Sequence, residues 1–271
     1  MEQETNITLT EENYHSPEAK LKYLGSSQFK AFKACEAAAL AEARGEYEPK
    51  KTTALLVGSY VDAYYSGTLE QFKADNPDIF KKDGTLKSDY VQAERIIDFL
   101  NQDPVMTRYL SEGEHQKIMT GKIAGVDFKI KIDNLRVKSI IDQKVMSDLD
   151  GTWIKKDGKN VLVNFVEAFR YDIQGAIYQT VVEQNLGKKL PFVLAVVTKE
   201  EPPRKGLFEI DQEDLDKALE EVKQLAPRYD AIKRGIIEPT ACGNCPYCRS
   251  RAKVTGVKSY HILDPYKEDE F

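Results

Sequence analysis

The sequence predicts an α/β or α+β fold in which a mixed β-sheet is flanked by helices. Residues 26–110 are dominated by the helical spacing of apolar side chains, whereas residues 114–145 alternate between apolar and polar as strands do. After a helical segment at 171–186, residues 190–198 form a continuous apolar run, which is typical of a strand buried on both faces. This order of elements indicates a sheet covered by helices.

The composition indicates an ordinary globular domain. Of the 271 residues, 41% are hydrophobic and 31% are charged, which is enough to bury a substantial core. No apolar run approaches the roughly 18–20 residues that span a bilayer, and the N-terminus has no secretory pattern, so we expect a cytoplasmic protein without a membrane segment. The net charge of −5 argues against a wholly nucleic-acid-binding surface. A single basic groove that contains Lys129, Lys131 and Lys144 is compatible with this net charge.

A single domain is expected to cover most of the chain. Residues 1–22 are polar, hold no sustained period and are predicted to form a flexible arm. The domain then covers residues 23–271, including a cysteine cluster at 242–248. We find no internal repeat or low-complexity stretch that divides it.

The element boundaries follow from capping residues and turn signals. A helix should begin at Ser26-Ser27, where either serine can be the N-cap, and continue to Gly45. A second helix is predicted to begin near residues 51–53. Four further helices are predicted at 87–101, 104–110, 171–186 and 211–235. Strands are predicted at 114–119, at two runs within 125–145, and at 161–166, 190–198 and 206–210. Residues 147–160 should form a loop or short strand.

The clearest local signal is a β-hairpin. Two runs within residues 125–145 alternate strictly and are separated by a polar break. An antiparallel pairing centred on that break places Asp133 opposite Asp142, and Lys131 opposite Lys144. Like charges that face each other across strands destabilise a sheet. Because a bound divalent cation relieves such crowding, this hairpin is the functional candidate.

The charged residues of the hairpin suit metal-assisted hydrolysis of a phosphodiester. The carboxylates of Asp133 and Asp142 can hold Mg²⁺ or Mn²⁺, with the backbone carbonyl of Gln143 as a further ligand. Such an ion polarises a phosphoryl oxygen and lowers the pKa of a bound water. Lys144 lies on the same strand face as Asp142 and can stabilise charge that develops on the phosphate. The alternative interpretation is an exposed strand face that carries mixed charges.

The predicted helix at 171–186 adds two polar side chains to this candidate site. Gln174 and Tyr178 are four residues apart and project from one face, with Tyr171 one turn earlier. Their amide and phenol groups could hydrogen-bond to a metal-bound water or a DNA phosphate. Alternatively, they pack at the edge of the core.

This ordered set of Asp133, Asp142-x-Lys144 and Gln174-x-x-x-Tyr178 resembles the PD-(D/E)XK nuclease superfamily. More narrowly, it resembles the branch with the RecB nuclease domain, lambda exonuclease and the exodeoxyribonuclease VIII (RecE) type of phage nuclease. The similarity extends along most of the chain. The matching segments are SSQFKAFKACEAAALAE, GSYVDAYY, FKIKIDNL with IIDQK, YDIQGAIYQ and CGNCPYCR.

The resemblance implies a restriction-endonuclease-like core and a Mg²⁺-dependent deoxyribonuclease. Asp133 would be the principal metal ligand, Asp142 the second acid and Lys144 the catalytic lysine, while the Gln/Tyr helix would orient substrate or water. Asp62, in GSYVDAYY, stands where many relatives have histidine and is expected to be a carboxylate ligand.

The resemblance also implies a substrate and partners. We expect an exonuclease that acts on linear duplex DNA ends in phage-type recombination, with a single-strand annealing protein as partner and a homo-oligomeric state. Two alternatives remain open at this point. One is a structure-specific endonuclease, and the other is a non-catalytic DNA-binding or assembly protein that retains the fold.

Four cysteines form a second candidate site. Cys35 stands alone, and Cys242, Cys245 and Cys248 form CGNCPYC. In a cytosolic chain this pattern indicates metal ligands more readily than disulfides. Some RecB-branch nucleases use one early and three late cysteines to hold a 4Fe–4S cluster, so the resemblance favours a cluster, with Zn²⁺ as the alternative. A further alternative is a buried Cys35 and a late cluster without a specific metal.

Overall fold

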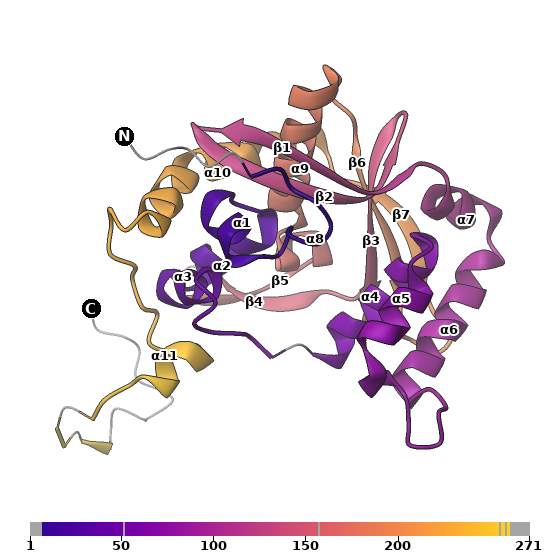
Figure 1. The fold of residues 1–271 in the computed structure, drawn as a ribbon, viewed down its shortest axis with the longest axis horizontal. Coiled ribbons are helices and arrows are strands. Elements are labelled where there is room, and N and C mark those ends of the chain that lie inside the picture. Colours follow the sequence, from indigo (N-terminus) through magenta and orange to yellow (C-terminus); the bar gives the residue numbers. More distant parts are fainter. Residues whose placement is uncertain (1–6, 51, 157, 255, 258, 261–271) are drawn as a thin grey trace.

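A five-stranded mixed β-sheet forms the centre of the protein (Figure 1). The computed structural model describes residues 7–50, 52–156, 158–254, 256–257 and 259–260. The strand order is β1-β2-β3-β6-β7, and all neighbours are antiparallel except β3 and β6, which are parallel. The strands are β1 (Glu114–Ile123), β2 (Val126–Arg136), β3 (Ser139–Met146), β6 (Phe192–Thr198) and β7 (Lys205–Glu209). The predicted α/β class is confirmed.

Helices cover both faces of the sheet because β6 is apolar on both sides. All residues of β6 are buried, and its alternate side chains join two separate hydrophobic cores. The first core lies under α2 (Ser26–Ala34), α3 (Glu36–Ala43), α9 (Tyr171–Leu186) and α10 (Gln212–Lys233). The second lies under α4 (Thr53–Tyr65), α6 (Ser88–Asn101), α7 (Pro104–Ser111) and the turn η1 (Pro77–Ile79), with α5 (Leu69–Asp75) alongside.

Most predicted elements are confirmed. The helix at 171–186 has the predicted bounds, and Gly187 ends it in the left-handed conformation with φ of 65°. The strand β1 is longer than predicted and continues to Ile123. Within the part of the chain that the structure describes, none of the helices combines the length and apolar character that crossing a bilayer requires.

The predicted continuous helix from residue 26 to residue 45 is wrong at its centre. Two helices, α2 and α3, meet at Cys35, whose backbone is extended with φ of −164° and ψ of 107°. The start at Ser26 is confirmed, but the N-cap is Gly25 and no side chain caps the helix. Apolar spacing continues through the break, so periodicity alone could not reveal it.

The N-terminal segment is packed rather than loosely attached. Residues 7–22 are described and include α1 (Pro17–Lys22), whereas residues 1–6 lie outside the described part of the chain. Tyr14 is only 9% exposed, and its backbone carbonyl accepts a hydrogen bond from the Lys129 ammonium. The Tyr23 hydroxyl donates to the Ile7 carbonyl at 3.1 Å. The predicted flexible arm is therefore wrong for residues 7–22.

A third difference lies between β3 and α9. The segment expected to be a loop or short strand, residues 147–160, takes part in a two-stranded antiparallel ribbon of β4 (Thr152–Lys156) and β5 (Lys159–Val163). The predicted strand at 161–166 ends early because Asn164 caps the short helix α8 (Phe165–Phe169) by accepting from the Glu167 N–H at 3.0 Å. This segment leads directly into α9.

Candidate active site and cysteine centre

The β2–β3 hairpin has the predicted register, but its pairing stops beside the acidic residues. Asn134 pairs with Ile141, and within the two described strands no pair lies beyond it. Where the next pair would lie, the Gln143 backbone N–H donates instead to the Asp133 carboxylate at 2.8 Å. The strands separate here, so Asp133 and Asp142 are neighbours of an opening in the sheet rather than members of a regular ladder.

Beyond this point strand β3 keeps only its other partner, β6. From Ile140 to Met146 it pairs in parallel with β6, and this pairing supports Asp142 and Lys144. The predicted facing of Lys131 and Lys144 is wrong, because the two strands have diverged. Lys131 instead forms an ion pair with Glu11 at 3.4 Å.

Asp142 is the most enclosed carboxylate of the site. Its side chain is 2% exposed, and one oxygen accepts a hydrogen bond from the Gln174 amide of α9 at 2.6 Å. The other oxygen forms an ion pair with the Lys144 ammonium. Burial opposes the charge of Lys144, but Asp142 and Asp133 outweigh it and raise the pKa of Lys144 to about 12. Lys144 is therefore a protonated cation at the centre of the site.

Two half-buried carboxylates from other elements complete the acidic group. Burial raises the pKa of Asp133 well above its usual range, and the charges of Asp142 and Asp62 raise it further. Burial raises the pKa of Asp62, on α4, to about 6, with Asp142 adding to the effect and Lys131 opposing it. The structure thus brings together the three predicted carboxylates, whose mutual repulsion a divalent cation would offset.

These residues fit a magnesium or manganese ion in the chemistry of their donors. Asp62, Asp133 and Asp142 offer hard carboxylate oxygens, and among the described residues the buried Asp142 Oδ2 has the Lys144 ammonium as its partner and no neutral donor. Among the described residues, however, the carboxyl oxygens of these three do not form a group as tight as the sulfurs of the four cysteines.

Gln116 is a site residue that the sequence analysis missed. Its amide donates to both oxygens of Asp62, at 3.0 and 3.2 Å. Its φ of 52° is left-handed, and the β1–β2 ladder skips it between the pairs of His115 and Lys117. A non-glycine residue in this conformation inside a strand is costly, and such outliers gather at functional sites. A lone glutamine in an alternating strand gave no signal of this role.

Helix α9 positions the site through its predicted polar face. Gln174 binds Asp142, as described above, and the Tyr178 hydroxyl donates to the backbone carbonyl of Lys131 at 2.9 Å. Tyr178 is 7% exposed, and burial raises its pKa well above the usual value. Its hydroxyl therefore fixes β2 two residues before Asp133, in the protonated form.

A second cation stands beside Lys144. Both ammonium groups lie near the ring of Tyr171, with Lys144 at 5.1 Å and Lys30 of α2 at 5.5 Å from the ring centre. Lys30 also donates to the Phe169 carbonyl at 3.2 Å. Burial and then the charge of Lys144 lower the pKa of Lys30. The spacing of α2 gave no indication that Lys30 belongs to the site.

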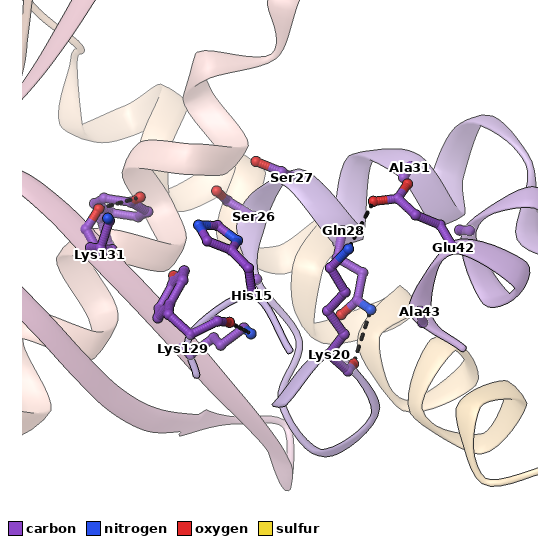
Figure 2. A pocket seen from close by; sticks show the side chains of 14 residues that line it. His15, Lys20, Ser26, Ser27, Gln28, Ala31, Glu42, Ala43, Lys129 and Lys131 are labelled. Carbon is purple, nitrogen blue, oxygen red and sulfur yellow. Dashed lines mark hydrogen bonds and ion pairs between the residues drawn. The ribbon is translucent and has the colours of Figure 1, made fainter. Parts of the chain in front are cut away.

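A basic pocket adjoins the acidic group and is shown in Figure 2. It has a volume of about 350 Å³ and shares Lys131 and Tyr178 with the site. Its lining also includes the first residues of α2, three basic side chains and two other polar ones: His15, Lys20, Lys129, Tyr14 and Glu42. Lys129, which the sequence analysis assigned to a possible basic groove, is 5% exposed and donates to a backbone carbonyl of the packed N-terminal segment.

The pocket favours an anion. The first N–H groups of α2 have no side-chain cap. Burial is the largest cause that lowers the pKa of His15, and the positive charges of Lys131, Lys129 and Lys20 lower it further. Glu42 offsets Lys20 in part, through an ion pair of 3.4 Å. Because phosphates bind readily at helix N-termini next to cations, the chemistry of this pocket matches a phosphate group.

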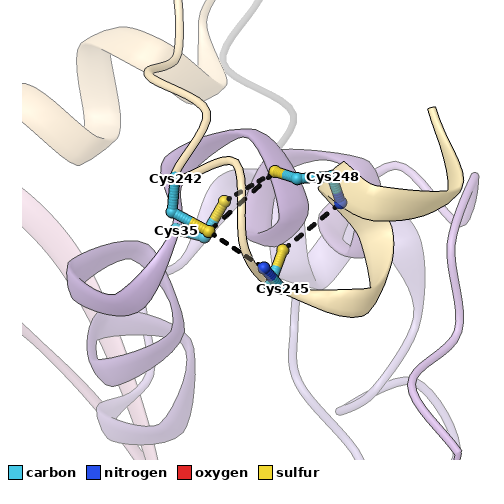
Figure 3. A group of neighbouring side chains, drawn as sticks. All are labelled: Cys35, Cys242, Cys245 and Cys248. Atoms are coloured by element: carbon cyan, nitrogen blue, oxygen red, sulfur yellow. Dashed lines mark hydrogen bonds between the residues drawn. The ribbon is translucent and has the colours of Figure 1, made fainter. Parts of the chain in front are cut away.

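The four cysteines come together as predicted (Figure 3). All four sulfurs lie within 4.8 Å of one another, and all four side chains are free thiols. Cys35 and Cys248 are buried, while Cys242 is exposed. Backbone N–H groups of Asn244 and Cys245 lower the pKa of Cys242 to about 6. A gathered set of thiols, one of them easily ionised, is the chemistry of a metal centre.

These features define a protein of the PD-(D/E)XK nuclease superfamily. They are the mixed sheet, the two aspartates with their lysine, and the glutamine of α9 that supports them. Within it, the chain belongs to the family described as "PDDEXK-like domain of unknown function (DUF3799)", whose model matches residues 25–251. A crystal structure from Eubacterium rectale, described as "Putative exonuclease", is 40% identical and has a TM-score of 0.90. The match covers 96% of this chain and 100% of that one. No curated protein matches the chain.

Neutralising Asp62 should stabilise the metal-free protein in a pH-dependent way. The pKa of Asp62 is about 6 in the folded protein and 3.8 in the free side chain, so the unfolded state releases this proton at a lower pH. The free energy of unfolding therefore falls as the pH rises from about 4 to about 6. Asp62→Asn should therefore raise the free energy of unfolding by about 1–2 kcal/mol near neutral pH with chelator present. The gain should vanish below about pH 4, where both states are protonated.

Denaturant titrations at the two pH values measure this difference. Added Mg²⁺ should reverse the order of stability, because the variant has lost a ligand. An equal gain at both pH values would show that the charge of Asp62 is not its cause.

Proposed function

We propose that this protein is a metal-dependent deoxyribonuclease that degrades linear DNA from its ends. The observation that carries the proposal is the convergence of Asp62, Asp133 and Asp142 around the protonated Lys144, at the point where β2 and β3 separate. Residues 23–271, with the packed segment 7–22, would act as one domain. The likeness to the described exonuclease of Eubacterium rectale supports the same reaction class.

Asp133, Asp142 and Asp62, with the Gln143 carbonyl, are the groups that would hold Mg²⁺ or Mn²⁺. When bound, such an ion polarises the phosphoryl oxygen and lowers the pKa of its water. The Gln174 amide holds one oxygen of Asp142, so that the other oxygen has a fixed direction. Gln116 orients Asp62 in the same way. These amides stay neutral and therefore orient the carboxylates without competing for the cation.

Two lysines would act on the phosphate itself. In this structure Lys144 neutralises Asp142; with a divalent cation held by the carboxylates, the Lys144 ammonium would be available to donate to a phosphoryl oxygen or to position the attacking water. Lys30 also lies beside the Tyr171 ring and would contact a neighbouring phosphate. The ring of Tyr171 stabilises both cations.

The basic pocket supports an exonuclease over an endonuclease. A continuous strand needs an open groove, whereas a pocket of about 350 Å³ with an uncapped helix terminus and lysines suits one terminal phosphate. Lys131 and Tyr178 belong to both the pocket and the site, so a bound end would lie next to the carboxylates. The roles in phage-type recombination, with an annealing protein and a homo-oligomer, rest on the sequence resemblance and stay predictions.

Removal of either central charge should abolish DNA degradation. Asp133→Asn and Lys144→Met should each reduce the rate on linear duplex DNA with Mg²⁺ by roughly 10²–10³-fold or more, because each removes a group that stabilises charge in the transition state. Asp127→Asn is the matched control, since this acid lies on β2 but pairs with Lys122 at 3.2 Å.

Gel assays of fluorescently labelled DNA measure these rates, and circular dichroism checks the fold. Activity that survives both substitutions would contradict the proposed site. If wild-type protein binds no Mg²⁺ in calorimetry, the non-catalytic alternative is favoured instead. Cleavage of covalently closed circular DNA at a comparable rate would favour the endonuclease.

The pocket predicts a preference for phosphorylated ends. Duplexes with a 5′-phosphate, a 3′-phosphate or only hydroxyl ends should differ in KM, because one terminal phosphate gains charge-assisted hydrogen bonds of about 1.5–3 kcal/mol. Lys131→Met should abolish that preference. Lys138→Met, an exposed lysine at the tip of the same hairpin, should retain it. Equal KM for all three substrates in the wild type would exclude the pocket as the end-binding site.

A further inference from the structure

We propose that the four cysteines hold a single zinc ion in a tetrahedral tetrathiolate site, in place of the 4Fe–4S cluster that the sequence resemblance implies. The proposal concerns Cys35, Cys242, Cys245 and Cys248 and does not rest on the proposed nuclease activity. It follows from the separations of their sulfurs, from the local backbone around them and from their place in the fold.

The sulfur separations match one small ion. With Zn–S bonds of about 2.3 Å, the sulfurs of a tetrahedral site lie about 3.8 Å apart. In this protein the Sγ atoms of Cys35 and Cys248 are 3.6 Å apart, and those of Cys242 and Cys248 are 4.0 Å apart. No pair among the four is separated by more than 4.8 Å. The set therefore surrounds a space that fits one ion at its centre.

A 4Fe–4S cluster requires a wider set. Each cysteine binds a different iron of the cube, so the four sulfurs lie outside the cluster and farther from one another than in a one-ion site. To admit the cube, the sulfurs of Cys35 and Cys248 would have to move apart, although both side chains are buried. The geometry here does not fit that group.

The late cysteines are arranged around the site by their own backbone. The N–H of Cys245 donates to the sulfur of Cys242 at 3.3 Å, and the N–H of Cys248 donates to the sulfur of Cys245 at 3.4 Å. Cys245 is also the N-cap of the short helix α11 (Pro246–Ser250). Donors that point at sulfur stabilise thiolates and fix their direction, which is the second-sphere support that a zinc tetrathiolate needs.

The centre joins two distant parts of the chain. Cys35 lies at the break between α2 and α3, and the extended backbone there turns its sulfur toward α11. Beside it, the Ala37 N–H donates to the Thr240 carbonyl at 3.1 Å, and the Thr240 N–H donates to Glu36 at 2.8 Å. A five-residue helix is too short to be stable alone. A zinc ion would hold this C-terminal segment on the domain.

The same ion would position helix α2. Helix α2 begins at the wall of the basic pocket, presents Lys30 to the active site and ends at Cys35. The zinc site therefore fixes the far end of a helix whose other end and middle are expected to meet the substrate. Its role is structural, since all four positions are taken by protein ligands and none is open to water.

Metal analysis of the whole protein tests the proposal. Protein purified anaerobically without added metal should be colourless and contain one equivalent of zinc by elemental analysis. After exchange with Co²⁺ alone, it should show the visible absorption of tetrahedral cobalt tetrathiolate. Cys242→Ser, at the exposed ligand, should lose the zinc and the cobalt spectrum, while Ser250→Ala at the end of α11 should retain both.

Two results would overturn it. One is a brown protein with absorption near 400 nm and four equivalents each of iron and sulfide. The other is wild-type protein that binds neither Zn²⁺ nor Co²⁺ and whose four thiols react freely with a thiol reagent. Neither measurement involves DNA or Mg²⁺, so failure here is separate from failure of the nuclease assay. The wild-type zinc content decides the question even if the Cys242 variant does not fold.

Discussion

The active site depends on the point at which strand β2 separates from strand β3. Up to this point β3 pairs with both β2 and β6, and beyond it β3 pairs with β6 alone. On the turn side of Asn134 and Ile141 the hairpin is regular, and beyond them the strands part. This opening lets Asp133 and Asp142 approach without sharing a ladder, while the Gln143 N–H that a regular partner would use binds Asp133. Every other element of the site acts on these two carboxylates, through hydrogen bonds, charge or support of the strands.

Helix α2 connects the three candidate sites. It supplies the uncapped N–H groups of the basic pocket, the second active-site cation Lys30 and, at its end, the thiol of Cys35. Helix α2 packs against α10 through contacts of Phe29 and Phe32 with Tyr229, so these three groups are carried by one packed helix. A metal centre more than one turn away can therefore matter to substrate binding without touching the substrate.

The sequence predicted the parts of the protein that have a strong local period or a motif. The hairpin register, helix α9 and the gathering of four cysteines all follow from such signals. The break at Cys35, the packed segment at 7–22 and the left-handed Gln116 do not, because tertiary contacts decide them. Lys30 reaches the site only through the packing of α2 beside α9, which no spacing rule contains. Metal preference was equally hidden, since sulfur separations exist only in the folded chain.

We propose that Asp133 and Asp142 hold a catalytic cation, and a crystal soaked in Mn²⁺ is the most direct test. We expect an anomalous peak about 2.0–2.3 Å from carboxylate oxygens of both residues, with the Lys144 ammonium displaced from Asp142. A soaked crystal with no such peak, in which Lys144 still neutralises Asp142, would contradict it.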